Sequence, residues 1–313
     1  MSRDFAVWPY RFRFRALEHV VFPPGKAGNI LRGAFGTIFQ RMACMPDCSD
    51  AQSCAGASSC PYARVFEPRQ EWVDTLGPSG LADWPRPFAF RAVHLDGRRV
   101  EPGEEFWFDL VLFDEPANTL PYFVMTFREV ARSGLGPGRG RAELVGVTGL
   151  PGGAAVFDGN RFHRESIQGL RLDLAAAGEP CGSVRLRFTT PTELKSGGQP
   201  VSRPEFGVLF RRLRDRVSNL RAFYQGGPLE IDFTSLAAEA DRTRIVECRL
   251  REQVERRWSS RTHQRHPLGG FAGEVEYEGE LGPFLGFLRA GEWTGVGRQT
   301  VWGKGCFELM PPG

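Results

Sequence analysis

The hydrophobic and polar positions of this chain follow two periods, and the order of the two periods repeats along the sequence. Residues 5–19 alternate aromatic side chains with arginines. A period of two predicts a strand with one apolar face and one basic face. Residues 27–42 place apolar side chains at every third or fourth position, which predicts an amphipathic helix.

Shorter patterns complete the first half. Residues 87–94 and 105–113 predict strands, residues 118–132 predict a second helix, and residues 142–147 predict another strand. A basic glycine-rich segment at 134–141 separates the second helix from the strand that follows it. The predicted order is β-α-β-β-α-β.

The second half gives the same order. Strands are predicted at 182–190, 243–258, 270–277 and 306–310, and helices at 204–223 and 281–290. We therefore predict an α+β protein made of two tandem ferredoxin-like domains, the arrangement that RNA-recognition domains also use. The expected domains are residues 1–150, with a cysteine-rich insertion at 44–60, and residues 183–313. Residues 151–182 are expected to form the linker.

A second glycine-rich segment, residues 295–305, has the sequence Gly-Val-Gly-Arg-Gln-Thr-Val-Trp-Gly-Lys-Gly. Its glycines permit close approach of another backbone, and its two cations favour phosphate. A strand is predicted next, whereas P-loops and dinucleotide-binding loops introduce a helix. We interpret the segment as a contact for a nucleic-acid backbone; the alternative is a turn with no ligand. The residues assigned to this contact are Gly295, Gly297, Arg298, Gly303, Lys304 and Gly305.

Bulk composition adds little to this interpretation. The chain has 313 residues, a net charge of +3 and 41% hydrophobic residues, which suits a globular protein. Of its 40 basic residues only Lys26, Lys195 and Lys304 are lysine. Arginine binds phosphate well, although a GC-rich genome explains the bias equally well. No signal peptide or long apolar run is visible, so we expect a cytoplasmic protein with reduced thiols and no membrane partner.

Four of the seven cysteines, Cys44, Cys48, Cys54 and Cys60, fall within one short segment. Four thiolates in a compact loop suit a tetrahedral zinc site. A four-iron cluster and unliganded thiols are the alternatives. Any metal here is expected to be structural, because four cysteines leave no open coordination position.

Several of these segments together resemble the RAMP superfamily of CRISPR-associated proteins, and within it the endoribonucleases that process pre-crRNA. The resemblance rests on residues 31–36 (Leu-Arg-Gly-Ala-Phe-Gly), the cysteine loop running into 65–68 (Val-Phe-Glu-Pro), and both glycine-rich segments. It continues through residues 188–192 with Leu194 and Lys195, and through 258–261 (Trp-Ser-Ser-Arg).

The resemblance implies a specific chemistry. CRISPR repeat RNA is bound, a ribose 2′-hydroxyl attacks the adjacent phosphate, and a 2′,3′-cyclic phosphate and a 5′-hydroxyl result without a catalytic metal. The reaction needs a general base, a general acid and cations for the phosphorane charge. The alternative is a non-catalytic crRNA-binding subunit of a CRISPR effector complex, in contact with other subunits. An unrelated RNA-binding protein with tandem ferredoxin-like domains is a third possibility.

Many members of the superfamily carry a catalytic histidine near the first helix, but no histidine occurs here between Pro23 and Cys60. His19 precedes the helix, and Arg32 on the helix is a candidate to hold phosphate. Residues 258–266 contain His263 and His266, which are candidates for the base and the acid; the alternative is a solvated polar loop. Further expected RNA contacts are Lys26, Arg139, Arg141, Ser259 and Arg261.

Overall fold

The computed structural model describes residues 3–44, 48, 54–68, 84–174, 180–253, 256–259, 264–267 and 269–311, with the backbone alone at 256–259 and 264–267. The chain divides into two compact units. The N-terminal unit comprises residues 6–170 and 222–227. The C-terminal unit comprises residues 1–5, 171–221 and 228–313.

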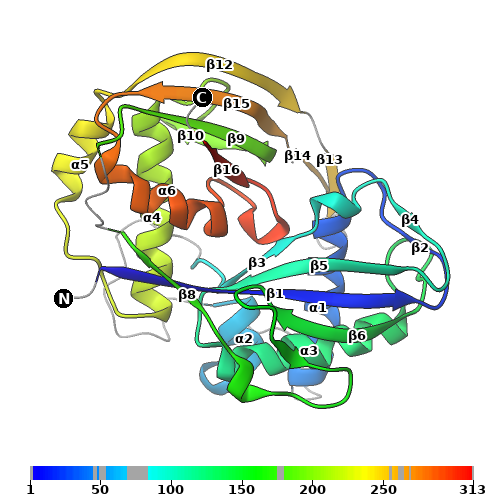
Figure 1. Ribbon diagram of the computed structural model, residues 1–313. Coiled ribbons are helices and arrows are strands. Elements are labelled where there is room, and N and C mark those ends of the chain that lie inside the picture. The colour runs from blue at the N-terminus through cyan, green and yellow to red at the C-terminus, as the bar shows by residue number, and fades with distance from the viewer. Residues whose placement is uncertain are drawn as a thin grey trace. The chain divides into compact units, whose positions relative to one another are not determined.

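The N-terminal unit contains the predicted β-α-β-β-α-β order, which Figure 1 labels along the chain. Its sheet has the order β3-β5-β1-β6, and these neighbours are antiparallel. This is the strand order of a ferredoxin-like fold. The elements are β1 (Asp4–Ala16), α1 (Ala27–Ala43), β3 (Phe88–Arg91), β5 (Glu105–Leu112), α3 (Pro116–Ser133) and β6 (Ala142–Gly149).

The C-terminal unit repeats the pattern with its own sheet, ordered β12-β15-β9-β16 and again antiparallel. The prediction of two ferredoxin-like modules is therefore confirmed. The elements are β9 (Ser183–Thr192), α4 (Phe206–Tyr224), β12 (Arg244–Gln253), β15 (Gly270–Glu278), α6 (Leu285–Thr294) and β16 (Phe307–Met310).

Smaller elements decorate both modules. Two strands, β7 and β8, fall within the segment predicted as a linker, and β7 joins the N-terminal sheet beside β6. The short pairs β2·β4, β10·β11 and β13·β14 are antiparallel. Their bounds are β2 (Val20–Val21), β4 (Arg99–Val100), β7 (Ala155–Phe157), β8 (Leu170–Asp173), β10 (Leu194–Ser196), β11 (Gln199–Val201), β13 (Arg256–Ser259) and β14 (Gln264–Pro267), and the two further helices are α2 (Pro61–Phe66) and α5 (Phe233–Ala240).

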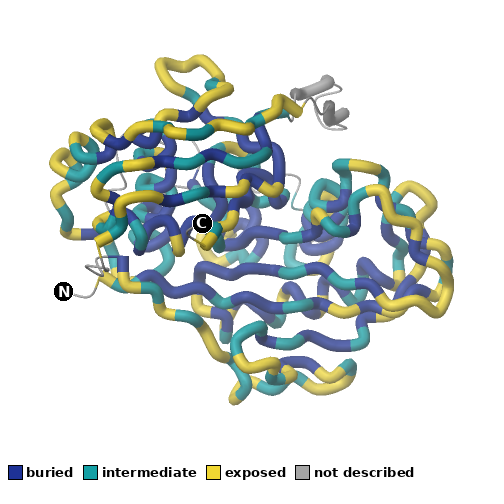
Figure 2. The backbone as a smooth tube through the Cα atoms, turned by 45° about the horizontal axis from the view of Figure 1, so that its top comes forward, coloured by how far each residue is buried: buried dark blue, intermediate teal, exposed yellow. Residues whose placement is uncertain are grey.

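Phenylalanine rings form the core of the N-terminal unit, on the sheet face that α1 and α3 cover. Phe35 of α1 stacks on Phe123 of α3 with ring centroids 4.3 Å apart, and Phe12 stacks on Phe108 across β1 and β5 at 5.2 Å. Each ring removed from water contributes roughly 1.5–3 kcal/mol. Figure 2 shows buried positions running along the strands, with exposed positions gathered in the connecting loops.

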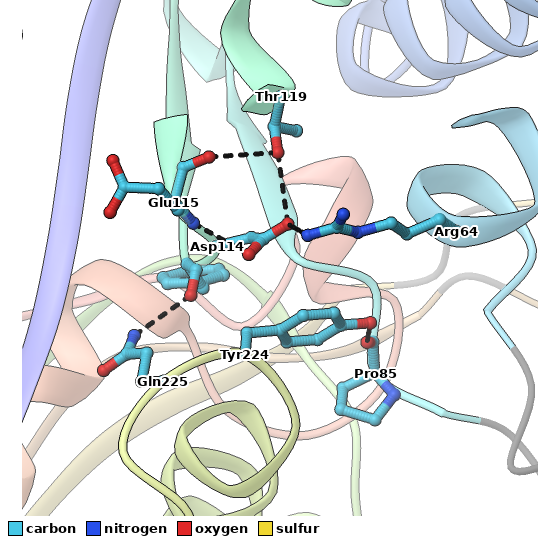
Figure 3. A network of polar contacts seen from close by, with 8 residues as sticks. Arg64, Pro85, Asp114, Glu115, Thr119, Tyr224 and Gln225 are labelled. Atoms are coloured by element: carbon cyan, nitrogen blue, oxygen red, sulfur yellow. Dashed lines mark hydrogen bonds and ion pairs between the residues drawn. The ribbon is translucent and has the colours of Figure 1, made fainter. Parts of the chain in front are cut away.

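A polar network fixes the segment that follows the cysteine loop (Figure 3). Arg64 of α2 donates to the buried carboxylate of Asp114 at 2.9 Å, and Thr119 donates to the same carboxylate at 3.1 Å. Tyr224 donates its hydroxyl to the carbonyl oxygen of Pro85 at 2.8 Å. A buried carboxylate needs such donors, so the network anchors α2 to the start of α3.

Candidate catalytic residues and nucleic-acid contacts

His19 is paired with a carboxylate that the sequence patterns did not reveal. The strands β2 and β4 pair Val20 with Val100 and Val21 with Arg99. The next position of this antiparallel ladder places His19 opposite Glu101. His19 Nδ1 lies 2.7 Å from Glu101 Oε2, and both side chains are about half exposed.

The basic glycine-rich segment 134–141 also packs against the residues around His19. Gly140 packs so closely on His19 that an added Cβ would collide with the His19 carbonyl oxygen. The backbone N–H of Leu17 donates to the carbonyl oxygen of Arg141 at 2.9 Å. The structure thus brings together two sequence candidates, His19 and the first glycine loop.

The charges around His19 are arranged in pairs. Arg99 Nε donates to Glu101 Oε1 at 3.0 Å, and Arg141 donates to Glu18 through Nη2 at 2.7 Å. Hydrogen bonds from Arg141 lower the pKa of Glu18. Arg139 is exposed and adopts a left-handed backbone with φ of 49°. Arg139 therefore points a cation into solvent from the loop that packs on His19.

The other two histidines with described side chains, His94 and His163, make contacts that suit a structural role. His163 Nε2 lies 2.9 Å from Asp158 Oδ2, and its Nδ1 lies 3.4 Å from Glu165 Oε1. His94 stacks on Trp107 at 3.7 Å, and burial lowers its pKa. A histidine that bonds carboxylates through both ring nitrogens has no lone pair to accept a proton. Among the described side chains, His19 has the arrangement best suited to proton transfer.

The remaining candidates belong to the first helix and to the β13·β14 hairpin, and the structure describes the side chains of the first group only. Arg32 of α1 sits over the ring of Phe66, 4.7 Å from its centroid, and Lys26 occupies the position preceding the first turn of α1. His263 and Arg261 lie outside the described residues. His266 and Ser259 are described by backbone alone, in the β13·β14 hairpin, where His266 pairs with Arg257.

The terminal glycine loop folds back on itself and on the end of β9. Its four glycines, Gly295, Gly297, Gly303 and Gly305, all have positive φ. The backbone N–H of Val296 donates to the Gly305 carbonyl oxygen at 2.9 Å. Gly297 passes so close to the carbonyl oxygen of Glu193 that a Cβ would collide with it. The glycines are therefore required by the loop's own packing.

The two cations of this loop differ in exposure. The side chain of Arg298 is 60% exposed and lies beside Glu193, whereas Lys304 is only 8% exposed. A phosphate can reach an exposed guanidinium without rearrangement of the loop. Arg298 is therefore better placed than Lys304 for contact with a polyanion.

Several arginines of the sheet faces predicted as basic are paired with acidic neighbours on the adjacent strand. Arg187 of β9 pairs with Glu274 of β15 at 2.9 Å, and Arg11 of β1 pairs with Asp109 of β5 at 2.8 Å. Trp107 on β5 has Arg11 on its ring at 3.5 Å and His94 stacked at 3.7 Å. Base stacking on a sheet needs an open aromatic face, and the contacts with Arg11 and His94 occupy ring surface of Trp107.

The four candidate zinc ligands are linked by pairwise contacts. Cys44 interacts with Cys48 and Cys60, and Cys48 interacts with Cys54. Burial, reinforced by the neighbouring thiols, raises the pKa of Cys44 to about 12. Within the described residues, no three His, Cys, Asp or Glu side chains form a metal-binding group. The contacts therefore do not by themselves define a coordination shell.

Two family models cover most of the chain. Residues 5–168, just over half of it, match the AF_1859_N N-terminal domain. Residues 186–307 match the model of the CRISPR-associated endoribonuclease Cas6. The chain therefore belongs to the AF_1859_N family through its N-terminal domain. Its C-terminal part carries a domain that matches the Cas6 model, which supports its recognition as a RAMP-type CRISPR-associated protein.

Solved structures share this fold, and a sequence relative matches part of the chain. A Cas6 product complex is 18% identical, with a TM-score of 0.53 over 98% of this chain and 100% of that one. Thermus thermophilus Cas6 is 14% identical, with a TM-score of 0.54 over 99% and 100%. At such identities the likeness shows the fold. An uncharacterized protein of Archaeoglobus fulgidus is 24% identical over 193 residues, which span 60% of this chain and 62% of that protein.

The described helices include none with the length and apolar character needed to span a membrane.

Proposed function

We propose that this chain is an endoribonuclease that cuts CRISPR repeat RNA without a catalytic metal ion. Family membership supports the substrate class. The observation that carries the proposal is the pairing of His19 Nδ1 with Glu101 Oε2 at 2.7 Å. In neutral imidazole the paired nitrogen donates its proton and the other nitrogen keeps a lone pair. His19 Nε2 is therefore the proposed proton acceptor.

The reaction follows from that arrangement. His19 Nε2 takes the proton of the ribose 2′-hydroxyl, and the 2′-oxygen forms a bond to the adjacent phosphorus. The bond from phosphorus to the 5′-oxygen breaks, which leaves a 2′,3′-cyclic phosphate and, after protonation of the leaving oxygen, a 5′-hydroxyl. The leaving oxygen needs a general acid for this proton. His263 and His266 remain a separate catalytic proposal, as a base and acid pair of their own, because histidine titrates near neutral pH.

RNA binding is assigned to the cations of the glycine-rich loops. We propose that Arg139 and Arg141 contact backbone phosphates near His19, and that Arg298 does so in the terminal loop. Lys26, Lys304, Ser259 and Arg261 remain proposed secondary contacts, with Arg32 a proposed phosphate ligand.

Structural zinc is proposed for Cys44, Cys48, Cys54 and Cys60. Their donor chemistry suits it, since four thiolates complete a tetrahedral shell and leave no position for a substrate. Zinc would fold the segment between α1 and α2 and take no part in cleavage. An iron–sulfur cluster is the alternative for the same donors.

One experiment tests the enzymatic proposal. End-labelled repeat RNA is incubated with the protein in EDTA, and the product ends are identified. We expect cleavage at one site, a cyclic phosphate, and no cleavage of RNA with a single 2′-deoxyribose at that site. His19→Ala should lose about 10²–10⁴-fold in rate, whereas His163→Asn should cut at the wild-type rate.

The competing function is a non-catalytic crRNA-binding subunit. The absence of histidine from α1 favours it. Tight repeat-RNA binding without cutting, in EDTA and in magnesium, would establish it. Other CRISPR proteins are then the proposed partners; one structural neighbour of 13% identity is a partial Cas6-RT-Cas1–Cas2 complex, with a TM-score of 0.57 over 99% of this chain and 46% of that one.

A further inference from the structure

We infer that Glu101 is a positioning residue for His19, and that Arg99 fixes the Glu101 carboxylate in the orientation that His19 requires. The inference rests on the proposed ribonuclease function, because it assigns a role in proton transfer. It adds two residues that no sequence pattern had singled out.

The backbone holds Glu101 opposite His19. The β2·β4 pairs Val20↔Val100 and Val21↔Arg99 set the register. Immediately after the ladder, the backbone N–H of Glu101 donates to Glu104 Oε2 at 2.8 Å. The Glu104 carbonyl oxygen accepts from the N–H of Ala16 at 2.9 Å, at the end of β1. The carboxylate therefore projects from a turn tied to the central strand.

The two carboxylate oxygens of Glu101 have separate partners. Oε2 faces His19 Nδ1 at 2.7 Å, and Oε1 accepts from Arg99 Nε at 3.0 Å. Arginine has donors only, so Oε1 is committed to Arg99 as an acceptor. Oε2 also accepts, which keeps the proton of neutral His19 on Nδ1 and the lone pair on Nε2.

The arrangement makes an uncommon prediction for Glu101→Gln. Arg99 can accept nothing, so the glutamine oxygen must face Arg99 and its NH₂ group must face His19. An NH₂ group opposite Nδ1 requires a lone pair there, which moves the His19 proton to Nε2. His19 Nε2 then carries a proton and cannot accept one from the substrate. The Asp-to-Asn change in the serine-protease triad is damaging for the same reason, because it stabilises the wrong histidine tautomer.

Stability is not the reason for these pairs. The side chains of His19, Glu101 and Arg99 are 49%, 52% and 58% exposed, and exposed ion pairs stabilise proteins little. Their effect is expected on the orientation and tautomer of His19. A purely structural contact would show no dependence on which way an amide faces.

Single-turnover cleavage at saturating enzyme tests the inference with four variants. His19→Ala reports the proposed function itself. Glu101→Ala should slow cleavage about tenfold, a part of the total general-base contribution, with unchanged RNA affinity. Glu101→Gln should be slowed at least as much. The double variant Arg99→Ala/Glu101→Gln should recover part of the loss, because glutamine can then turn its oxygen toward His19.

A second readout does not depend on activity. The ¹⁵N shifts of the His19 ring at alkaline pH should report the Nδ1–H tautomer in the wild type and the Nε2–H tautomer in Glu101→Gln. Glu165→Gln, beside His163, is the matched control and should leave His19 unchanged.

The outcomes separate the two proposals. Wild-type cleavage by His19→Ala would remove His19 from the reaction, whatever its tautomer. Loss of activity in His19→Ala, combined with wild-type rates and an unchanged His19 tautomer in Glu101→Gln, would overturn the role of Glu101 alone. A double variant no faster than Glu101→Gln would overturn the role of Arg99.

Discussion

Arg298 is held against Glu193 by two contacts, one from its backbone and one from its side chain. The Arg298 N–H donates to the Glu193 carbonyl oxygen at 3.2 Å, and Arg298 Nη1 lies 3.1 Å from Glu193 Oε1. Glu193 is 16% exposed and Arg298 is 60% exposed. A largely buried carboxylate thus orients a guanidinium that keeps most of its surface in solvent.

We predict that Arg298→Gln weakens repeat-RNA binding and reduces its dependence on salt. Loss of one phosphate contact should lower the slope of log affinity against log salt concentration by about 0.7, the value for single-stranded nucleic acid. Fluorescence anisotropy at several salt concentrations measures the slope.

Arg187→Gln is the matched control, because Arg187 is also a half-exposed arginine paired with glutamate. It lies on β9 and should leave both affinity and slope unchanged. Equal losses in the two variants would mean that general charge, rather than the terminal loop, governs binding.

The first glycine loop gives a prediction for stability. Gly140→Ala should destabilise the protein by roughly 1–3 kcal/mol, because its Cβ would collide with the His19 carbonyl oxygen. Gly138 lies in the same loop with nothing near its Cβ position, so Gly138→Ala should change stability by less than about 0.5 kcal/mol. Urea unfolding compares them, and similar costs for both would contradict the close packing of the loop on His19.

The hydrophobic pattern was enough to predict both ferredoxin-like modules, because most of the main strands and helices bury one face and so carry a clear period. Residues 118–132, for example, correspond to α3 at Pro116–Ser133. Short elements carry too few residues for a period. The helix α5 was missed for this reason, although Asp232 accepts from the backbone N–H groups of Thr234 and Ser235 and so initiates it.

The site was less predictable than the fold. Alternation correctly placed Arg185 and Arg187 on one face of β9, but the sequence of one strand does not reveal that Glu276 and Glu274 of β15 lie opposite them. The pairing of His19 with Glu101 depends on a two-residue ladder between segments about eighty positions apart. No local signal in the sequence specifies that register, because such a short ladder is set by the surrounding fold.

The cysteine loop leads to a prediction about metal content. Purified protein should contain about one zinc ion per chain, as expected for a closed four-thiolate site. Cys54→Ser should lower that content and reduce stability, whereas Cys248→Ser, at an exposed position on β12, should change neither. Elemental analysis and unfolding measure both effects. If the protein contained iron and acid-labile sulfide, the bound group would be an iron–sulfur cluster and not zinc. Metal-free protein of unchanged stability would exclude a structural metal.

His163 leads to a prediction about pH. Its hydrogen bond to Asp158, with a smaller contribution from Glu165, raises the pKa of His163. A group with a raised folded-state pKa stabilises the protein fully below its unfolded pKa, about 6.5 for histidine. That contribution is lost as the pH rises through the folded-state pKa. His163→Asn should therefore destabilise the protein more at pH 5.5 than at pH 9.

Urea unfolding of the wild type and the variant at both pH values measures this difference. Asp158→Asn removes the main partner of His163 and should share the dependence on His163 protonation. Its amide oxygen can still accept from the backbone N–H groups of Asn160 and Arg161, which donate to Asp158 Oδ1 in the wild type, so the turn itself should be kept at both pH values. If His163→Asn cost the same stability at both pH values, the contact would act as a neutral hydrogen bond, and His163 would not need its positive charge.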